Sequence, residues 1–515
     1  MNESAAQPAR AWRWLLALLA LALALRLFGW TEPWSGRGFR SAFATVTTGC
    51  YARNFAEHGI WAAKAMPYYW RIELVDGSIA HEYYAHHPAL YALVGGLSLE
   101  CFGVREWALT LPYLLFSLAS VAAVWKLARE WWGLVEANLA GLFLAVVPLS
   151  AWYGTLAWID GLTITFHALA VLCWLRWMRG GGKRALFLGA LAMFGAGLCD
   201  WSGALLLPGL GLHALVLARA RGWGLLGGAL LFPLGFALAV LLHALHMRAV
   251  LPPELMHGDT QDTLSWVQAL PTDFWSFVRA QIGHQAKLLT LPVCALLLFA
   301  WGWQFARILR GRACLEQQLL FALFPPGLLY IALVPSRSIN HEFFSYVSLP
   351  WMALSFAWLL SSLRVDPRHW ATRTALVLLA ATCAWRNAEI WVAERGEALS
   401  KLVQQEWLAP LLDDPRAVLV ASPNAGLALP FYTRAPLVPG IDSVEKLERL
   451  RADVLSKVGP GRRIVFLFDL AGAQLYEPLR TYLAANATAV PHLELVGGQP
   501  PIALESYELG EWARR

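Results

Sequence analysis

Long apolar runs alternate with short polar ends over most of this chain. Runs of about 17–25 residues, each long enough to cross a bilayer as a helix, recur as far as about residue 388. The first, "WLLALLALALALRLFGW", lacks a small-residue cleavage site and is expected to remain as a helix. The pattern predicts about eleven spanning helices, over roughly 12–30, 105–125, 134–152, 156–177, 184–200, 202–219, 224–246, 286–308, 317–335, 343–363 and 371–388.

Other segments break this pattern. The stretch 88–103 is interpreted as a re-entrant or interfacial helix, and the later part of 247–285 as an amphipathic interfacial helix. After about residue 390, "RAVLVAS" and "RRIVFLFDL" are typical of buried strands, and "SVEKLERLRADVLSKV" and "GAQLYEPLRTYLAAN" of helices. The predicted fold is therefore a polytopic α-helical membrane protein, with a membrane domain over 1–389 and a small soluble α/β domain over 390–515.

Composition and charge placement support this division. The chain is 58% hydrophobic and 15% charged, whereas soluble proteins carry about a quarter charged residues. Alternate ends of the predicted spans are basic, for example at 176–184 and 219–221, and the turns near 150–155 and 199–203 contain no Lys or Arg. The positive-inside rule then predicts a cytoplasmic amino terminus, and an odd number of spans places the first loop (31–104) and the carboxyl-terminal domain outside.

The same features exclude several classes of function. Topology explains the net charge of +6, so no nucleic acid partner is expected. The seven Cys are scattered and form no disulfide framework. The sequence contains neither a Walker loop nor a dinucleotide fingerprint, which argues against nucleotide hydrolysis.

Asp160, in "YGTLAWIDGL", is the most informative ionisable residue. It lies near the outer end of a predicted span, with no basic residue within a turn or two. One interpretation is a carboxylate solvated at the water boundary. The other is a carboxylate directed into an enclosed cavity, where it acts as a general base or anchors an acceptor.

"HEYYAHHPALY", residues 81–91, gathers polar side chains before an apolar segment. His81, Glu82, His86 and His87 could bind a divalent metal, because imidazole and carboxylate suit zinc, although the spacing matches no zinc motif. Contacts with phosphate or hydroxyl groups are a second interpretation, and an ordinary wet loop is a third.

Two further segments of the external face carry charge. In "GFRSAFATVTTGCYARNFAEHG", Arg40 and Arg53 are basic on the predicted outer side, so they favour either an anionic partner such as phosphate or contact with lipid headgroups from an interfacial helix. Asp200, in "CDWSG", is interpreted first as a helix cap and otherwise as a substrate contact.

"SRSINHEFFSYVSLP", residues 336–350, places Arg337, His341 and Glu342 beside aromatic side chains at the mouth of a span. Ionisable groups at membrane depth usually mark a functional site. Donors beside an apolar wall suit an amphiphile with a phosphate head and a hydrocarbon tail, so the stretch predicts a site for a lipid-linked phosphate.

These segments, in this order, resemble the GT-C superfamily of integral membrane glycosyltransferases, in particular bacterial relatives of protein O-mannosyltransferases and of the lipid A aminoarabinose transferase. The likeness covers about residues 12–390. It is carried by "FRSAF…ARNFAEHG", "YYAHHPALYALVGGLSLECFGVREWALTLPYLLFS", "YGTLAWIDGL" and "HEFFSYVSLP".

The resemblance implies transfer of a sugar, with inversion, from a polyprenyl-phosphate donor to a lipid, glycan or protein acceptor on the external face of a bacterial inner membrane. It matches Asp160 to the family's second-loop Asp, His87-Pro88 to its Lys-Pro or His-Pro element, and 337–342 to its late His-bearing loop. Asp160 and Glu82 become the candidate catalytic residues. The candidate substrate-binding residues are Arg40, Arg53, His86, His87, Asp200, Arg337, His341 and Glu342. No cofactor is assigned, and a divalent metal stays open.

One departure from the family pattern leaves the function open. Many members carry an acidic residue early in the first loop, whereas "GFRSAFATVTTG" has none. The chain then uses another carboxylate, or is a non-catalytic assembly protein. A third alternative is a lipid-phosphate or sugar transporter, although such proteins place charges near the midplane in two related halves.

Overall fold

The computed structural model describes residues 3–28, 39–251, 274–323, 326–339, 341–363, 369–394, 408–423, 429, 431–469, 475–490, 504–509 and 513. The chain divides into two compact units. One comprises 1–29, 86–91 and 111–390, and the other comprises 30–85, 92–110 and 391–515. The domain boundaries expected from the sequence, 1–389 and 390–515, stay a prediction.

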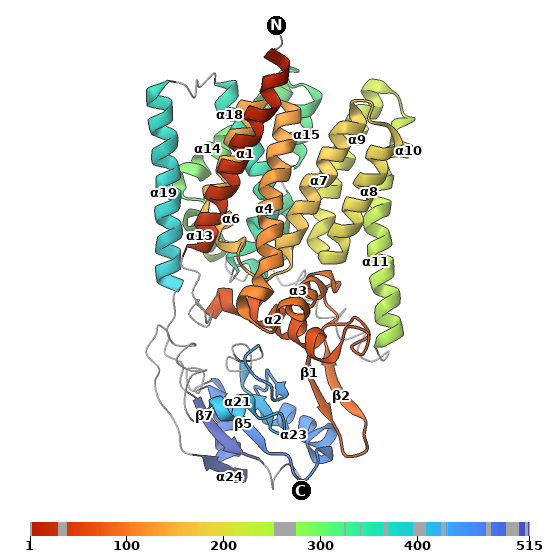
Figure 1. Cartoon of the computed structure of the whole chain (residues 1–515), viewed down its shortest axis with the longest axis vertical. Helices are drawn as coiled ribbons and strands as arrows, with labels where there is room; N and C mark the ends of the chain where they lie inside the picture. Colours follow the sequence, from red (N-terminus) through yellow and green to blue (C-terminus); the bar gives the residue numbers. More distant parts are fainter. Residues whose placement is uncertain are drawn as a thin grey trace. The chain divides into compact units, whose positions relative to one another are not determined.

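In the first unit, the described residues form helices and no strand (Figure 1). Its amino-terminal half contains α1 (Glu3–Leu27), most of α4 (Glu106–Trp131), α5 (Leu134–Val146), α6 (Pro148–Tyr153), α7 (Asp160–Met178), α8 (Gly182–Cys199), η2 (Trp201–Leu205), α9 (Leu206–Arg221), α10 (Leu225–Ala229) and α11 (Leu231–Val250). Its later half contains α13 (Phe274–Leu288), α14 (Leu291–Leu309), α15 (Leu315–Leu323), α16 (Pro326–Leu333), α17 (Pro335–Ser338), η3 (Glu342–Ser348), α18 (Leu349–Ser362) and most of α19 (Trp370–Glu394).

Eight stretches of the described residues are long and apolar enough to cross a membrane. They are Glu106–Trp131, Asp160–Met178, Gly182–Cys199, Trp201–Arg221, Leu225–Val250, Leu291–Leu309, Glu342–Ser362 and Trp370–Val392. The polytopic helical fold expected from the sequence is therefore confirmed, and the number of eleven spans stays a prediction. The segment expected as a re-entrant or interfacial helix forms α3 (Leu90–Phe102), which is shorter than a bilayer-spanning helix.

One predicted span is interrupted in the structure. The span expected over 134–152 divides into α5 and α6 because Val147 is extended (φ −63°, ψ 132°) immediately before Pro148. Proline has no N–H and disfavours a helical conformation of the residue before it. In the span expected over 317–335, the described residues form α15 up to Leu323 and α16 from Pro326, and 324–325 lie outside the described residues.

Close helix packing fixes the part of this unit that follows α7. Helices α7 and α8 form an antiparallel hairpin, and α11 packs against α8. At the contact of α8 with α11, a Cβ added to Gly235 would lie 2.2 Å from the carbonyl oxygen of Ala190. Small residues permit such close backbone approach between helices in membranes. The packed hairpin brings the start of α7 and the end of α8 to the same end of the bundle.

The second unit combines the first loop with the carboxyl-terminal region. Its first part has α2 (Phe39–His58), the antiparallel hairpin β1 (Tyr68–Glu73) and β2 (Ile79–Tyr83), and most of α3. Its last part has α21 (Ala409–Asp413), β3 (Val418–Ala421), β4 (Leu437–Val438), α23 (Val444–Asp453), η4 (Leu455–Lys457), β5 (Ile464–Asp469), α24 (Glu477–Asn486), β6 (Thr488–Val490) and β7 (Leu504–Glu508).

A five-stranded mixed sheet organises the last part, in the order β4-β3-β5-β7-β6. Strand β3 is parallel to β4 and β5, and β7 is antiparallel to β5 and β6. This confirms the small α/β region that the sequence predicted, including both strands identified from apolar runs. Its core also contains Trp70 and Ile72 of β1, which pack with Val420 and Phe466.

Candidate active site

Asp160 is the first residue of α7, where the helical hairpin meets the polar end of the bundle. Its side chain is buried, with 3% of the residue exposed. The hydroxyl of Ser202 donates a hydrogen bond to Asp160 Oδ1 at 2.6 Å. Among the described residues, no Lys, Arg or His lies within salt-bridge distance of this carboxyl group, and the hydrogen bond it accepts comes from the neutral Ser202 hydroxyl.

Asp200 lies in the turn between α8 and η2 and is also buried, with 1% exposed. Its Oδ2 accepts a hydrogen bond from the Ser202 backbone N–H at 2.9 Å, which is the capping role expected from the sequence. Its Oδ1 lies 2.7 Å from His87 Nδ1. Burial alone raises the pKa of the Asp200 carboxyl, but the His87 hydrogen bond and charge, together with the hydrogen bonds from Ser202, hold that pKa below its usual range.

These contacts form one hydrogen-bonded run of Asp160, Ser202, Asp200 and His87, here named the Asp160–His87 chain. Ser202 joins the two carboxylates, because the Ser202 hydroxyl donates to Asp160 and the Ser202 backbone N–H donates to Asp200. The run ends at His87, whose side chain is 18% exposed, whereas the Asp200 side chain is 2% exposed. It therefore leads from a buried carboxylate to a partly accessible imidazole.

Backbone contacts hold the turn that carries this chain. The Trp201 indole N–H donates to the carbonyl oxygen of His86 at 2.5 Å, so η2 is tied to the segment that contains His87. His167 Nε2, two turns into α7, lies 3.2 Å from the carbonyl oxygen of Gly203. These two contacts fix η2 against both neighbouring segments.

A second polar group, the Glu342 cluster, consists of Glu342, Lys287, Tyr153 and His284. Lys287 Nζ lies 3.1 and 3.0 Å from the two carboxylate oxygens of Glu342, and the Tyr153 hydroxyl donates to Oε1 at 3.2 Å. His284 Nδ1 is 4.0 Å from Oε2. The cluster joins α6, α13 and η3, and it gives the Glu342 carboxylate a cationic partner.

Aromatic side chains lie between the two polar groups. Tyr153, at the end of α6, packs against Trp158 at 5.3 Å between ring centroids, and Trp158 packs against Phe343 at 4.5 Å and Tyr346 at 5.5 Å. Within the part of the chain that the structure describes, the Trp158 indole N–H and the Tyr346 hydroxyl are buried without a hydrogen-bond partner. Buried polar groups are normally paired, so these two are candidates to bind a ligand.

The structure places the remaining predicted residues in different surroundings. Arg53 lies in α2, where its Nε is 3.3 Å from Glu57 and its Nη1 donates to the Phe431 carbonyl oxygen at 3.1 Å, so this guanidinium has protein partners. Glu82, on β2, accepts a hydrogen bond from the Trp70 indole N–H at 2.8 Å. The His341 ring lies 5.3 Å from Phe343. The side chains of Arg40 and Arg337 lie outside the described residues.

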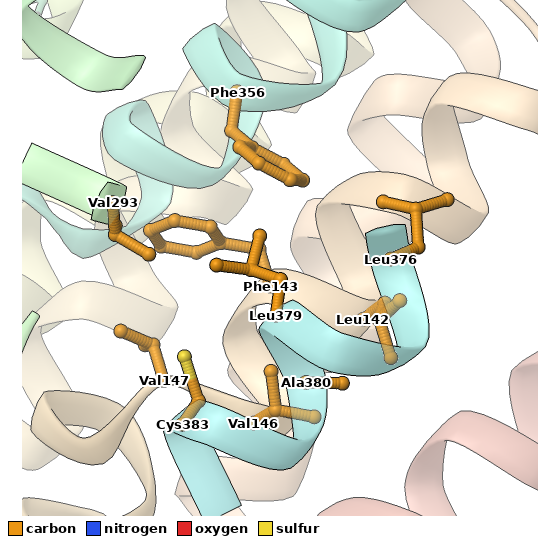
Figure 2. Close-up of a pocket in the computed structure, with 10 residues that line it drawn as sticks. All are labelled: Leu142, Phe143, Val146, Val147, Val293, Phe356, Leu376, Leu379, Ala380 and Cys383. Carbon is orange, nitrogen blue, oxygen red and sulfur yellow. The ribbon is translucent and has the colours of Figure 1, made fainter. Parts of the chain in front are cut away.

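No cluster of metal ligands accompanies these groups in the described residues, and one pocket that those residues form is apolar. The described residues contain no group of three or more His, Cys, Asp or Glu side chains arranged to hold a metal ion. Figure 2 shows a pocket among α5, α14, α18 and α19 whose lining side chains present only carbon and the sulfur of Cys383. This pocket offers no group for acid–base chemistry or for binding a phosphate.

Sequence reasoning did not identify Ser202, Lys287, Tyr153 or His284. A usable signal exists for α13, because Gln281, His284 and Lys287 recur every three residues on one side of an amphipathic helix. All three contact the segment before or at the start of η3: Gln281 Nε2 donates to the Ser338 carbonyl oxygen at 2.6 Å, and His284 Nε2 is 3.1 Å from that of Ile339. No comparable local pattern distinguishes Ser202.

Comparison with known proteins assigns a fold to this arrangement. A family model for dolichyl-phosphate-mannose-protein mannosyltransferases matches residues 86–246, a range that contains the whole Asp160–His87 chain. No curated protein of similar sequence was found.

Solved structures match over almost the whole chain. ArnT from Cupriavidus metallidurans bound to undecaprenyl phosphate matches with a TM-score of 0.60 at 15% identity, covering 96% of this chain and 98% of ArnT. The oligosaccharyltransferase AglB from Archaeoglobus fulgidus, in complex with an inhibitory peptide and a dolichol-phosphate, matches at 0.57 and 11% identity, covering 94% and 73%. Arabinofuranosyltransferase AftD from Mycobacteria matches at 0.54 and 15% identity, covering 97% and 40%. The chain therefore has the GT-C fold that its sequence resembled.

Proposed function

We propose that this multi-pass membrane protein transfers a sugar from a polyprenyl-phosphate donor to a hydroxyl group of a lipid, glycan or protein acceptor, with inversion at the anomeric carbon. The observation that carries the proposal is the Asp160–His87 chain. In it, a carboxylate that is buried and has no cationic partner among the described residues is linked to a partly exposed imidazole. The GT-C fold supports it, because ArnT has this fold and binds undecaprenyl phosphate.

Asp160 is assigned as the general base. The acceptor hydroxyl attacks the anomeric carbon from the face opposite the phosphate, so the new C–O bond forms as the bond to the phosphate oxygen breaks. The hydroxyl proton passes to the Asp160 carboxylate, and the electron pair of the broken bond leaves on the phosphate. Ser202, whose hydroxyl is 2.6 Å from Oδ1, orients the carboxylate for this transfer. Glu82 stays the alternative base.

His87 is assigned to the donor phosphate, and Asp200 to the orientation of His87. The carboxylate 2.7 Å from Nδ1 makes that nitrogen a hydrogen-bond donor and fixes the plane of the ring. Electrostatic stabilisation of a leaving phosphate is commonly the largest catalytic contribution in such reactions. Arg337 and His341 are proposed as further contacts of the same phosphate.

The Glu342 cluster is assigned to positioning the site. Glu342 forms a salt bridge with Lys287 and accepts a hydrogen bond from the Tyr153 hydroxyl. Tyr153 and Asp160 are the two ends of the 153–160 segment. The unpaired Trp158 N–H and Tyr346 hydroxyl between them are suitable donors for sugar hydroxyl groups. The charge pattern of the sequence supports the proposal that this face lies outside the membrane, which the family resemblance implies is a bacterial inner membrane.

One observation favours a second candidate, a non-catalytic GT-C-like protein. In α2 the first acidic residue is Glu57, near the end of the helix, and it pairs with Arg53. The first-loop acid that many family members use as a base therefore has no counterpart at the start of α2.

Transfer from radiolabelled donors distinguishes these candidates. Purified protein in detergent is given a panel of polyprenyl-phosphate sugars, with cell-envelope extract as acceptor, and both sugar transfer and slow donor hydrolysis are measured. The proposal predicts transfer of label from at least one donor by the wild-type protein and its loss in Asp160→Asn. Binding of undecaprenyl phosphate without transfer or hydrolysis from any donor would support the non-catalytic alternative. Movement of intact donor across proteoliposomes would support a transporter.

A further inference from the structure

A large apolar cavity lies in the helical unit among α7, α9, α10 and the start of α11. Its volume is about 370 Å³, and ten apolar residues line it, among them Trp174, Gly211, Leu215 and Pro233. The indole N–H of Trp174 donates to His213 Nδ1 at 3.1 Å, so even this polar atom already has a partner. By contrast, the pocket in Figure 2 has a volume of about 20 Å³, close to the space of one water molecule.

The cavity is not enclosed, because Leu215 and Leu230 in its lining are 52% and 57% exposed. Its apolar walls favour contact with apolar molecules over contact with water. An empty cavity also forfeits the dispersion contacts of the side chains that line it. Its walls are helices that cross the membrane, so hydrocarbon chains are the apolar material in contact with it.

The end of α9 next to the cavity carries unbalanced positive charge. Its last turn contains Arg219 and Arg221. Among the described residues, neither guanidinium has a carboxylate within salt-bridge distance, whereas the nearby Arg176 is 2.7 Å from Glu130 and Arg179 is 3.8 Å from Glu316. Trp223, which follows at once, is 66% exposed and suits the membrane–water interface.

The charges and the cavity are in register along the helices. Arg221 Nη1 donates to the Met178 carbonyl oxygen at 2.9 Å. Met178 is one helical turn beyond Trp174, about 6 Å along α7, and Gly211 is about 15 Å from Arg221 along α9. A headgroup at the arginines would therefore have its hydrocarbon chain beside the cavity.

We propose that this cavity is a binding site for one anionic phospholipid, with an acyl chain in the cavity and its phosphate at Arg219 and Arg221. Charge complementarity selects the headgroup, because juxtamembrane basic residues attract anionic lipids. The cavity, about 370 Å³ in volume, distinguishes this site from ordinary lipid around the protein. The proposal is independent of sugar transfer.

A substitution at Gly211 tests whether an acyl chain occupies the cavity. Gly211 lines the cavity, and a Cβ there meets no atom within 4 Å, so the backbone leaves room for a larger side chain and Gly211→Leu is expected to occupy part of the cavity. Gly302 in α14 is a matched control, because it is also a helical glycine with nothing within 4 Å and it does not line the cavity. Native mass spectrometry of the detergent-purified full chain with added phosphatidylglycerol measures occupancy. Gly211→Leu should reduce retention about tenfold or more, and Gly302→Leu should leave it unchanged.

The headgroup half is tested with the same measurement. Wild-type protein should prefer phosphatidylglycerol over phosphatidylcholine, and Arg219→Gln/Arg221→Gln should reduce that preference about tenfold. Arg310→Gln/Arg312→Gln, an exposed pair of the same spacing after α14, should keep it. Equal retention of the two lipids by the wild-type protein overturns the proposal, as does unchanged retention in Gly211→Leu.

Discussion

Two buried carboxylates in the helical unit, Asp160 and Glu342, differ in the charge of the group that contacts them. Both stand at the start of a spanning stretch and are less than a tenth exposed. Glu342 has the Lys287 ammonium group 3.0 Å away, whereas Asp160 is hydrogen-bonded by the neutral Ser202 hydroxyl. An adjacent cation makes a carboxylate a weaker base. The comparison therefore indicates that Asp160 is suited to accept a proton, whereas Glu342 is suited to position the segments that it joins.

The strongest test of this comparison is Asp160→Asn. Asparagine keeps the shape and can still accept the Ser202 hydrogen bond, but it cannot act as a base. We expect turnover to fall at least about 10²-fold, measured as radiolabelled sugar transfer. Expression and thermal stability should stay close to wild type, because the substitution preserves packing.

Three matched variants complete this experiment: Glu82→Gln, Glu342→Gln and Asp200→Asn. Each removes one carboxylate charge with little change of volume. Near-normal turnover in Asp160→Asn together with a collapse in Glu82→Gln would assign the base to Glu82. Normal turnover in all four variants would argue against carboxylate-dependent transfer.

Next in size is the effect of removing the proposed phosphate contacts before η3. Arg337→Ala and His341→Ala should each raise the apparent KM for the donor by an amount equivalent to one lost charged hydrogen bond, about 1.5–3 kcal/mol. The acceptor KM should not change, and titration with undecaprenyl phosphate should show the same loss of affinity. Unchanged donor affinity in both variants would require another role for 336–350.

Asp200→Asn should have a smaller effect, because it disturbs His87 without removing it. Asparagine has one acceptor oxygen, so it can cap η2 or accept from His87 Nδ1 but not both. The charge is also lost, so kcat/KM should fall about fivefold to tenfold, the loss of about 1–1.5 kcal/mol. His87→Gln is the partner variant. If Asp200 acts through His87, the double variant should be no worse than His87→Gln alone, whereas additive losses would separate their roles.

The smallest effect on turnover is expected for the salt bridge of the Glu342 cluster. Lys287→Met leaves the buried Glu342 carboxylate without its lysine partner, although the Tyr153 hydroxyl still donates to it. Because Lys287 is partly exposed, we expect a loss of about 1–2 kcal/mol of stability. Lys287→Met/Glu342→Gln should recover most of it, and transfer should stay within about threefold of wild type. Thermal unfolding and transfer are measured on the same samples. A 10²-fold loss of transfer in Lys287→Met would remove the distinction between the two carboxylates.

Much of the fold was predictable because the sequence pattern within each element is enough to identify it. The apolar runs of α7 and α8, and the strands β3 and β5, follow from the residues within them. The division of α5 from α6 was present in the sequence as Pro148, but the length of the apolar run around it favoured one continuous span. At this position the proline was the better signal, whereas Pro112 lies inside α4 without ending it.

The candidate site was predictable only in part because its contacts join distant segments. Asp160 was identified from its own apolar flanks, whereas the pairing of His87 with Asp200 spans 113 residues and that of Lys287 with Glu342 spans 55. Nothing near His87 specifies that a capping Asp will be its partner. Such pairs arise from helix packing, so one sequence gives the residue types without their partners.

The packing of β1 into the carboxyl-terminal core has a consequence for the order of biosynthesis. Trp70 and Ile72 share a core with residues of β5 and β7, and the Val75 backbone N–H donates to the Lys457 carbonyl oxygen at 2.9 Å. At synthesis rates of about 5–20 residues per second, the apolar side of the hairpin waits about 20–90 seconds for the strands that cover it. The hairpin is therefore expected to need a chaperone during translation. A chain shortened before residue 391 would leave Trp70 and Ile72 uncovered, and we expect quality-control proteases to degrade it.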